Sequence, residues 1–109
     1  MILQFARGDQ TVPNPTTSAI IHAGGLAAQA TLYRNDLAFQ ANPAVPKNPH
    51  SFLTNVTNPA IAQFALAAQN QIATFFASDG DTVIDPDGAG PIFETPMVGP
   101  PPEDLAFLP

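Results

Sequence analysis

Two side chains in this sequence could act together on a proton: Asp9, in the stretch "GDQTVP", and His50, in the stretch "NPHSFL", 41 positions later. An aspartate that accepts the Nδ1–H of a histidine fixes the tautomer of the ring and stabilises the imidazolium. The other ring nitrogen, Nε2, is then available to take a proton from a nucleophile. The two residues therefore supply two of the three members of a nucleophile–histidine–acid triad.

Both candidate residues follow segments that the sequence predicts to be strands. Residues 1–6, "MILQFA", form an apolar run of strand length, which is typical of a strand covered on both faces of a parallel sheet. Ala30 to Tyr33 are predicted to form a second short strand, followed by a less regular segment. Ligands of open α/β sheets gather at the carboxyl ends of the strands, where Asp9 and His50 are both expected.

Two helices are expected to cover this sheet. The first is predicted to begin at Asn14, with its side chain as the cap and Pro15 in the first turn, and to stop at Gly24 and Gly25. The second is predicted to run from Asn58 to Ser78 and to end at Gly80. Its apolar residues recur at the spacing of one helix face and are expected to pack on the sheet. They are Ile61, Phe64, Ala65, Ala68, Ile72, Phe75 and Phe76.

The remaining segments are predicted to be irregular. Residues 40–59 contain four prolines and form the expected loop that carries His50. Residues 81–109 are a tail rich in proline, glycine and acid, with a candidate short strand at Thr82 to Ile84. Two consecutive parallel strands joined by a helix predict an α/β fold with a right-handed crossover. Because stable sheets usually need three or more strands, we expect residues 1–80 to be the carboxyl-terminal part of a larger α/β domain.

Composition excludes several classes of function. The chain has 109 residues, which is one small domain at most, and no cysteine, so it forms neither disulfides nor thiolate metal sites. A formal charge of −6 repels nucleic acid and anionic membrane surfaces. No stretch reaches the roughly 20 apolar residues of a membrane span, and the first residues lack the layout of a signal peptide. Only 11% of residues are charged, which suggests a surface covered by more protein.

The two chemistry-bearing stretches and the second helix are similar to the last part of the α/β-hydrolases. "GDQTVP" resembles their acid turn, "NPHSFL" resembles their histidine loop, and the helix from Asn58 occupies the place of their last helix. The resemblance covers roughly residues 1–80 and looks closest to large bacterial lipases of the virulence-factor type. It implies that Asp9 is the triad acid and His50 the triad base, without a cofactor. It also implies an ester or lipid substrate, a missing amino-terminal part of the hydrolase domain as partner, and an extracellular or cell-envelope location.

The sequence departs from that family at the nucleophile. No GxSxG stretch occurs, and Ser18, Ser51 and Ser78 lack glycines on both sides at that spacing. The elbow that exposes the serine is therefore absent, together with the oxyanion-hole N–H that follows it. We expect the serine to lie upstream in the complete enzyme, and this chain alone to be inactive.

Three alternatives remain at this point. His22 is a competing histidine, but it falls in a predicted helix only 13 positions after Asp9. Acidic residues after the second helix suggest a calcium loop, although their spacing does not match one; they are Asp79, Asp81, Asp85 and Asp87. The third alternative is a small non-enzymatic interaction module, in which the apolar helix and the acidic tail bind a partner and the two candidate catalytic residues are incidental.

Overall fold

The protein forms a small α/β domain in a computed structural model, which describes residues 1–108. Its centre is a mixed sheet of three strands in the order β1-β2-β3. Strands β1 (Leu3–Ala6) and β2 (Ala30–Tyr33) run parallel, and β3 (Phe93–Glu94) pairs antiparallel to β2. The prediction of an α/β fold with two parallel strands at these positions is confirmed.

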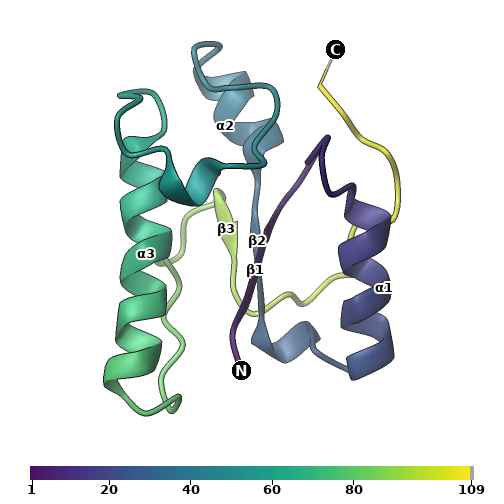
Figure 1. Ribbon diagram of the computed structural model, residues 1–109, viewed down its shortest axis with the longest axis vertical. Coiled ribbons are helices and arrows are strands. Elements are labelled where there is room, and N and C mark those ends of the chain that lie inside the picture. The colour runs from purple at the N-terminus through teal and green to yellow at the C-terminus, as the bar shows by residue number, and fades with distance from the viewer. Residues whose placement is uncertain (109) are drawn as a thin grey trace.

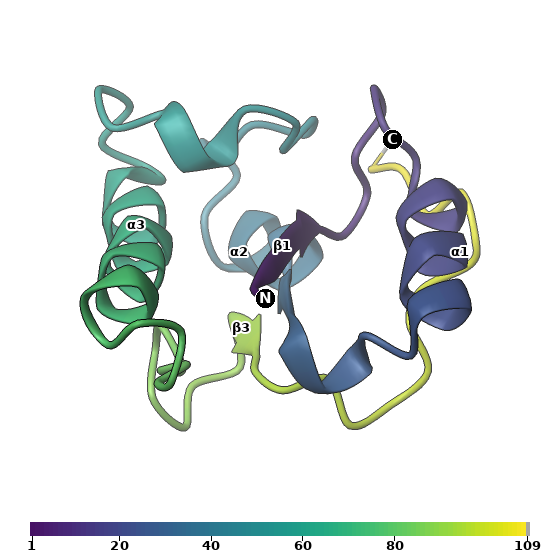
Figure 2. The ribbon, with the colours of Figure 1, turned by 60° about the horizontal axis from the view of Figure 1, so that its bottom comes forward.

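Helices cover the two faces of the sheet, as Figures 1 and 2 show. Helix α1 (Asn14–Gly24) connects β1 to β2 and lies on one face, whereas α3 (Ala62–Ala77) lies on the other. A short helix, α2 (Asn35–Ala41), follows β2 directly. Every residue of β2 is buried. Ala30 and Leu32 enter an apolar cluster on the α1 side. On the α3 side, Tyr33 enters a second apolar cluster and the Thr31 hydroxyl is hydrogen-bonded to α3.

The first strand pair aligns the ends from which the candidate residues emerge. Leu3 lies opposite Ala30, and Ala6 lies opposite Tyr33, so the two strands end at the same level. Parallel strands that end together place the segments after them at one edge of the sheet. The turn with Asp9 leaves the end of β1, and α2 followed by the loop with His50 leaves the end of β2.

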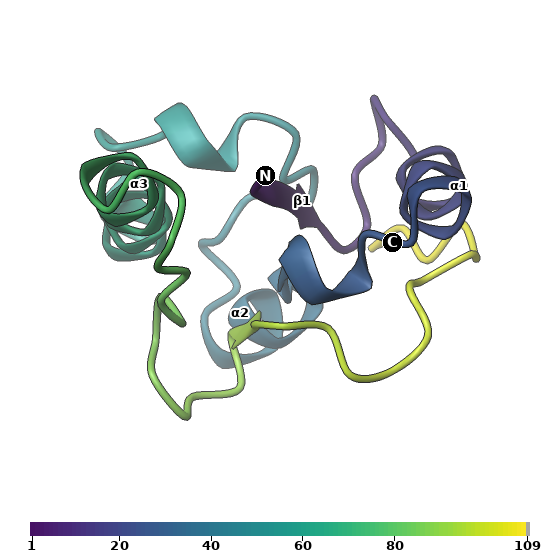
Figure 3. The same cartoon turned by 90° about the horizontal axis from the view of Figure 1, so that it is seen from below.

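The tail contributes more structure than its composition predicts. The strand expected at Thr82 to Ile84 is wrong, since these residues are irregular, and the third strand is instead the two-residue β3. Phe93 and Met97 are buried on opposite faces of the sheet. Figure 3 shows the chain running from β3 past α1 after these contacts. A few well-placed apolar residues therefore fix a segment whose proline and glycine content predicts an irregular tail.

The predicted helices are present with three corrections. Helix α1 ends as expected, but Pro13 occupies the cap position and the side chain of Asn14 bonds elsewhere. Helix α3 begins at Ala62, because the residues after Asn58 first make a tight turn in which the Asn58 side chain accepts the Ala60 N–H. Phe76 is 70% exposed and does not belong to the core. Helix α2 was not predicted, since seven residues carry too little periodicity to identify a helix.

A buried glutamine joins the elements on the α3 side of the sheet. Gln71 is fully buried on α3, and its Nε2 donates to Thr31 Oγ1 of β2 at 2.8 Å and to the carbonyl of Ile84 at 2.7 Å. Its Oε1 accepts a hydrogen bond of 2.6 Å from Gln4 of β1. Buried polar groups are stabilising only when they are paired, and this one links two strands, α3 and the tail.

An ion-pair cluster at the carboxyl end of β2 joins this strand to α2 and β3. Arg34 donates two hydrogen bonds to Asp36, at 2.9 and 2.7 Å, and a third to Glu94 at 2.9 Å. Burial alone would raise the pKa of the Asp36 carboxyl, but the hydrogen bond and charge of Arg34 outweigh it and hold that pKa below its usual range. Asp36 therefore stabilises the fold mainly in its ionised form.

This arrangement predicts how stability depends on acid. The folded-state pKa of Asp36 lies below the unfolded value of about 3.9, so its contribution is complete above that value and is lost as pH falls through the folded pKa. Asp36→Asn should lower the free energy of unfolding at pH 6 by about 1 kcal/mol, since the pair is partly exposed to solvent. The difference should shrink towards pH 2 in urea titrations. Asp81→Asn is the control, and a difference independent of pH would contradict this account.

Candidate functional site

The turn after β1 holds the carboxylate of Asp9 in a fixed orientation. Gly8 adopts φ +83°, a left-handed conformation that glycine accepts without strain, and this redirects the chain after the strand. The Oδ1 atom of Asp9 accepts the backbone N–H groups of Thr11 and Val12, both at 2.8 Å. Its second oxygen, Oδ2, is left to face the loop that follows α2. The Asp9 side chain is only 14% exposed.

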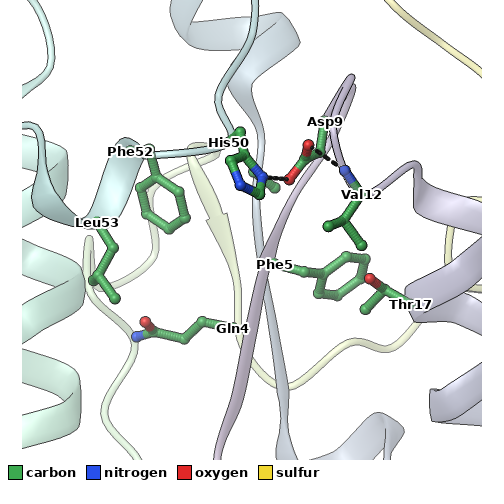
Figure 4. Close-up of a pocket in the computed structure, with 9 residues that line it drawn as sticks. Gln4, Phe5, Asp9, Val12, Thr17, His50, Phe52 and Leu53 are labelled. Carbon is green, nitrogen blue, oxygen red and sulfur yellow. Dashed lines mark hydrogen bonds and ion pairs between the residues drawn. The ribbon is translucent and has the colours of Figure 1, made fainter.

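His50 meets this carboxylate from the other loop. Its Nδ1 lies 3.1 Å from Asp9 Oδ2, as Figure 4 shows. An ionised carboxylate can only accept hydrogen bonds, so this contact places a proton on Nδ1. Within residues 1–108, Nε2 makes no hydrogen bond, and the imidazole is 45% exposed. The structure therefore brings together the two residues that the sequence singled out, in the orientation that leaves Nε2 free.

The loop that carries His50 is anchored by an aromatic side chain. Phe52 begins a 3₁₀ turn (Phe52–Thr54), is buried, and stacks on Tyr33 with ring centroids 4.6 Å apart. Tyr33 is the last residue of β2 and is completely buried. The histidine is thus tied, two residues along the chain, to the end of the central strand, which limits its movement despite the proline-rich loop.

A hollow of about 240 Å³ lies below this pair. Figure 4 shows His50 and Asp9 at its upper end, with Phe52 and Leu53 on one side and Phe5, Val12 and Thr17 on the other. Gln4 and Ala6 complete the lining. Since Gln4 and Phe5 point to opposite faces of the sheet, the hollow extends along the outer edge of β1, next to the pair.

The outer edge of β1 has no strand beside it in the part of the chain that the structure describes. At its end, however, the carboxamide of Asn14 takes the place of a neighbouring strand. Asn14 Nδ2 donates to the Ala6 carbonyl at 2.7 Å, and Asn14 Oδ1 accepts the Gly8 N–H at 2.8 Å. Asn14 is 2% exposed. The edge is therefore closed at the acid turn and open over the preceding residues of β1.

The other histidine and the serines lie in different surroundings. His22 pairs with Glu103 of the tail, Nε2 to Oε1 at 2.7 Å, and both side chains are more than half exposed. Ser18 donates to the Pro102 carbonyl and Ser78 to the Phe75 carbonyl, so both hydroxyls are used in holding backbone. None of the hydrogen bonds among residues 1–108 joins a serine side chain to His50.

The acidic residues after α3 do not gather around a common point. No group of three histidine, aspartate or glutamate side chains that could hold a metal ion occurs in the described residues. Burial and a hydrogen bond with Asp87 raise the pKa of Asp85. Asp87 itself supports β3, because its Oδ2 accepts the N–H groups of Ile92 and Phe93 at 2.8 and 3.2 Å. These carboxylates therefore organise the turn that leads into the last strand.

Fold and site together define a small α/β domain that presents an aspartate–histidine pair at the carboxyl edge of its parallel strands. Comparisons with protein-family models, curated proteins and solved structures find no match for the chain. None of the helices within residues 1–108 is both long and apolar enough to cross a membrane. The function is therefore argued below from the geometry of the site.

Proposed function

We propose that this chain supplies the triad acid and histidine of a serine carboxylic-ester hydrolase of the α/β type. The observation that carries the proposal is the contact of 3.1 Å between His50 Nδ1 and Asp9 Oδ2 at the carboxyl ends of two parallel strands. Two backbone N–H groups hold Oδ1 of the same carboxylate, which leaves Oδ2 to accept the Nδ1–H of His50. The resemblance of the two stretches to the acid turn and histidine loop of the family supports the same assignment.

The chemistry follows from which atoms are held and which are free. A serine hydroxyl placed near His50 Nε2 would lose its proton to that nitrogen while its oxygen attacks the ester carbonyl. Asp9 stabilises the imidazolium formed in this step, because its carboxylate faces Nδ1–H. The same proton then passes to the departing alcohol, and a water molecule repeats the sequence to release the acid.

The serine belongs, in this proposal, to a segment outside the present chain. Such a segment would lie along the open edge of β1, because the hollow there reaches His50 and backbone groups of β1 are available for pairing. The walls formed by Phe5, Val12, Phe52 and Leu53 would bury apolar side chains of that segment. We further propose lipid esters as substrates and a location outside the cytoplasm, both on the resemblance to exported bacterial lipases alone.

Ester hydrolysis by two forms of the protein tests this proposal. The 109-residue chain should hydrolyse p-nitrophenyl butyrate no faster than buffer, since none of its serine side chains bonds to His50 within the described residues. The chain joined to a GxSxG segment encoded upstream in the same gene region should hydrolyse the ester. A fluorophosphonate probe should label the serine of that segment.

Two results would contradict the assignment. Hydrolysis by the chain alone would require a different nucleophile. A folded, extended protein that neither hydrolyses the ester nor reacts with the probe would favour the alternative of a non-enzymatic interaction module, in which the apolar helix and the acidic tail bind a partner.

A further inference from the structure

The two residues on either side of Asp9 are each held by an asparagine side chain. The Gly8 N–H donates to Asn14 Oδ1 at 2.8 Å, and the Gln10 N–H donates to Asn48 Oδ1 at 3.2 Å. Asn14 is buried beside β1, whereas Asn48 belongs to the histidine loop, 38 positions after Gln10. One carboxamide thus fixes the acid turn to its own strand, and the other fixes it to the segment that carries the histidine.

Asn48 contacts both halves of the site. The oxygen that accepts the Gln10 N–H also accepts the backbone N–H of His50, again at 3.2 Å. Its Nδ2 donates to Thr11 Oγ1 at 3.4 Å. Among residues 1–108, the only other hydrogen bond between residues 9–12 and residues 48–50 is the one from His50 to Asp9. The Asn48 side chain therefore makes two of the three hydrogen bonds that join these two stretches in the described residues.

We propose that Asn48 is a positioning residue that sets the distance between the triad acid and the histidine. By bonding the amide next to Asp9 and the amide of His50 with one oxygen, it links the two backbones that carry the pair. The imidazole is 45% exposed, so water competes for Nδ1 whenever the loops separate. The role in catalysis rests on the proposed function, but the role in holding the pair together does not.

The sequence around Asn48 suits this role. Pro49, the residue between Asn48 and His50, is buried and has its φ fixed by the ring. The Phe52 N–H donates to the Pro49 carbonyl at 2.9 Å, which connects this point to the buried aromatic anchor of the loop. The carboxamide of Asn48 therefore projects from a backbone segment with little conformational freedom. Its hydrogen bond to the Gln10 N–H restrains the turn that carries Asp9 as well.

Three variants of the 109-residue chain test this proposal. Asn48→Ala removes all three contacts, while Asn48→Asp keeps the oxygen that accepts the two N–H groups. Asn42→Ala is the matched control, because Asn42 is an exposed asparagine of the same loop whose Oδ1 accepts only the nearby Ala44 N–H, at 3.0 Å.

Two measurements by nuclear magnetic resonance are needed. The first is amide exchange at Gln10 and His50. The second is the tautomer of the neutral His50 ring, from two-bond ¹⁵N–¹H correlations at about pH 8.5.

Asn48→Ala should speed exchange at both amides by roughly three- to tenfold, the effect of one lost hydrogen bond, and should lower the share of the Nδ1–H tautomer. Asn48→Asp should keep the two exchange rates and the tautomer share close to those of the unsubstituted chain, and Asn42→Ala should leave all of them unchanged. In the extended enzyme, Asn48→Ala should lower kcat about tenfold with little change in KM. Unchanged exchange and tautomer in Asn48→Ala, or equal changes in Asn42→Ala, would overturn the proposal.

These outcomes separate the two proposals. Exchange and tautomer are measured without any substrate, so an inactive extended enzyme with the expected spectra refutes the hydrolase function alone. Conversely, an active enzyme that depends on His50 but gives unaltered spectra and kcat in Asn48→Ala refutes the positioning role alone.

Discussion

Asp9→Asn in the extended hydrolase should lower kcat by about 10⁴-fold, the loss found when a triad aspartate becomes asparagine in serine proteases. The structure gives a specific reason. The Oδ1 position of Asp9 accepts two backbone N–H groups at 2.8 Å, so an asparagine would place its oxygen there. Its NH₂ group would then face His50 Nδ1 in place of Oδ2. The ring would have to accept at Nδ1 and carry its proton on Nε2, which cannot then act as a base.

The measurement is kcat for p-nitrophenyl butyrate, with the imidazole tautomer recorded on the same variant. His50→Ala should be at least as damaging, because it removes the base itself. Asp81→Asn is the control for loss of a carboxylate, as Asp81 lies exposed in the irregular segment after α3. Turnover within a few-fold of normal in Asp9→Asn, or a ring still protonated on Nδ1, would refute the assignment of Asp9 as the triad acid.

Tyr33→Ala should lower the free energy of unfolding by about 3–5 kcal/mol, which is the usual cost of deleting a large buried ring. Tyr33 is 0% exposed and its ring lies 4.6 Å from Phe52, 5.8 Å from Phe64 and 5.4 Å from Phe93 between ring centroids. These three rings come from the histidine loop, α3 and β3. One substitution at the end of β2 therefore removes the ring contacts to all three elements. In urea titrations, the midpoint of unfolding should move to a lower urea concentration.

Tyr33→Phe separates the ring from its hydroxyl. The Tyr33 hydroxyl is buried without a hydrogen-bond partner in residues 1–108, so its removal should leave stability unchanged or raise it. Burial also raises the pKa of the Tyr33 phenol, and this is the only tyrosine in the chain. Its ultraviolet titration should therefore coincide with alkaline unfolding. A Phe variant as unstable as the Ala variant would show that the hydroxyl makes an essential contact.

The sequence predicts the parts of this fold that repeat a local pattern. The apolar run before Gly8 and the β-branched and aromatic residues at 30–33 identify the two parallel strands, and Gly24 and Gly25 mark the end of α1. The meeting of Asp9 and His50 could be expected because both follow strands that run in the same direction. Their catalytic role stays a prediction, as does the hydrolase identity of the domain.

What the sequence could not predict depends on contacts between distant residues. Strand β3 has two residues, and its place is set by Phe93 packing on Tyr33 and by the side chain of Asp87. Asn14 is a residue type that commonly caps helices and stands at the start of one, but its carboxamide bonds the Ala6 carbonyl and the Gly8 N–H instead. Asn48 lies in a segment without periodicity, and only the folded structure shows that its side chain contacts the turn that carries Asp9. In each case the residue that fixes the structure is not among the close sequence neighbours on which periodicity and capping patterns depend.

The carboxamide of Asn14 also bears on how this chain behaves in solution. An open strand edge is a template on which other chains can assemble, and proteins avoid such assembly by keeping edges short. Because Asn14 bonds the Ala6 carbonyl and the Gly8 N–H, the groups of this edge that stay open to an incoming strand are those that precede the Ala6 carbonyl. Replacing it with an apolar residue would lengthen the exposed edge at the same time as it frees the acid turn. The residue that orders the acid turn thus also shortens the part of β1 on which another chain could pair.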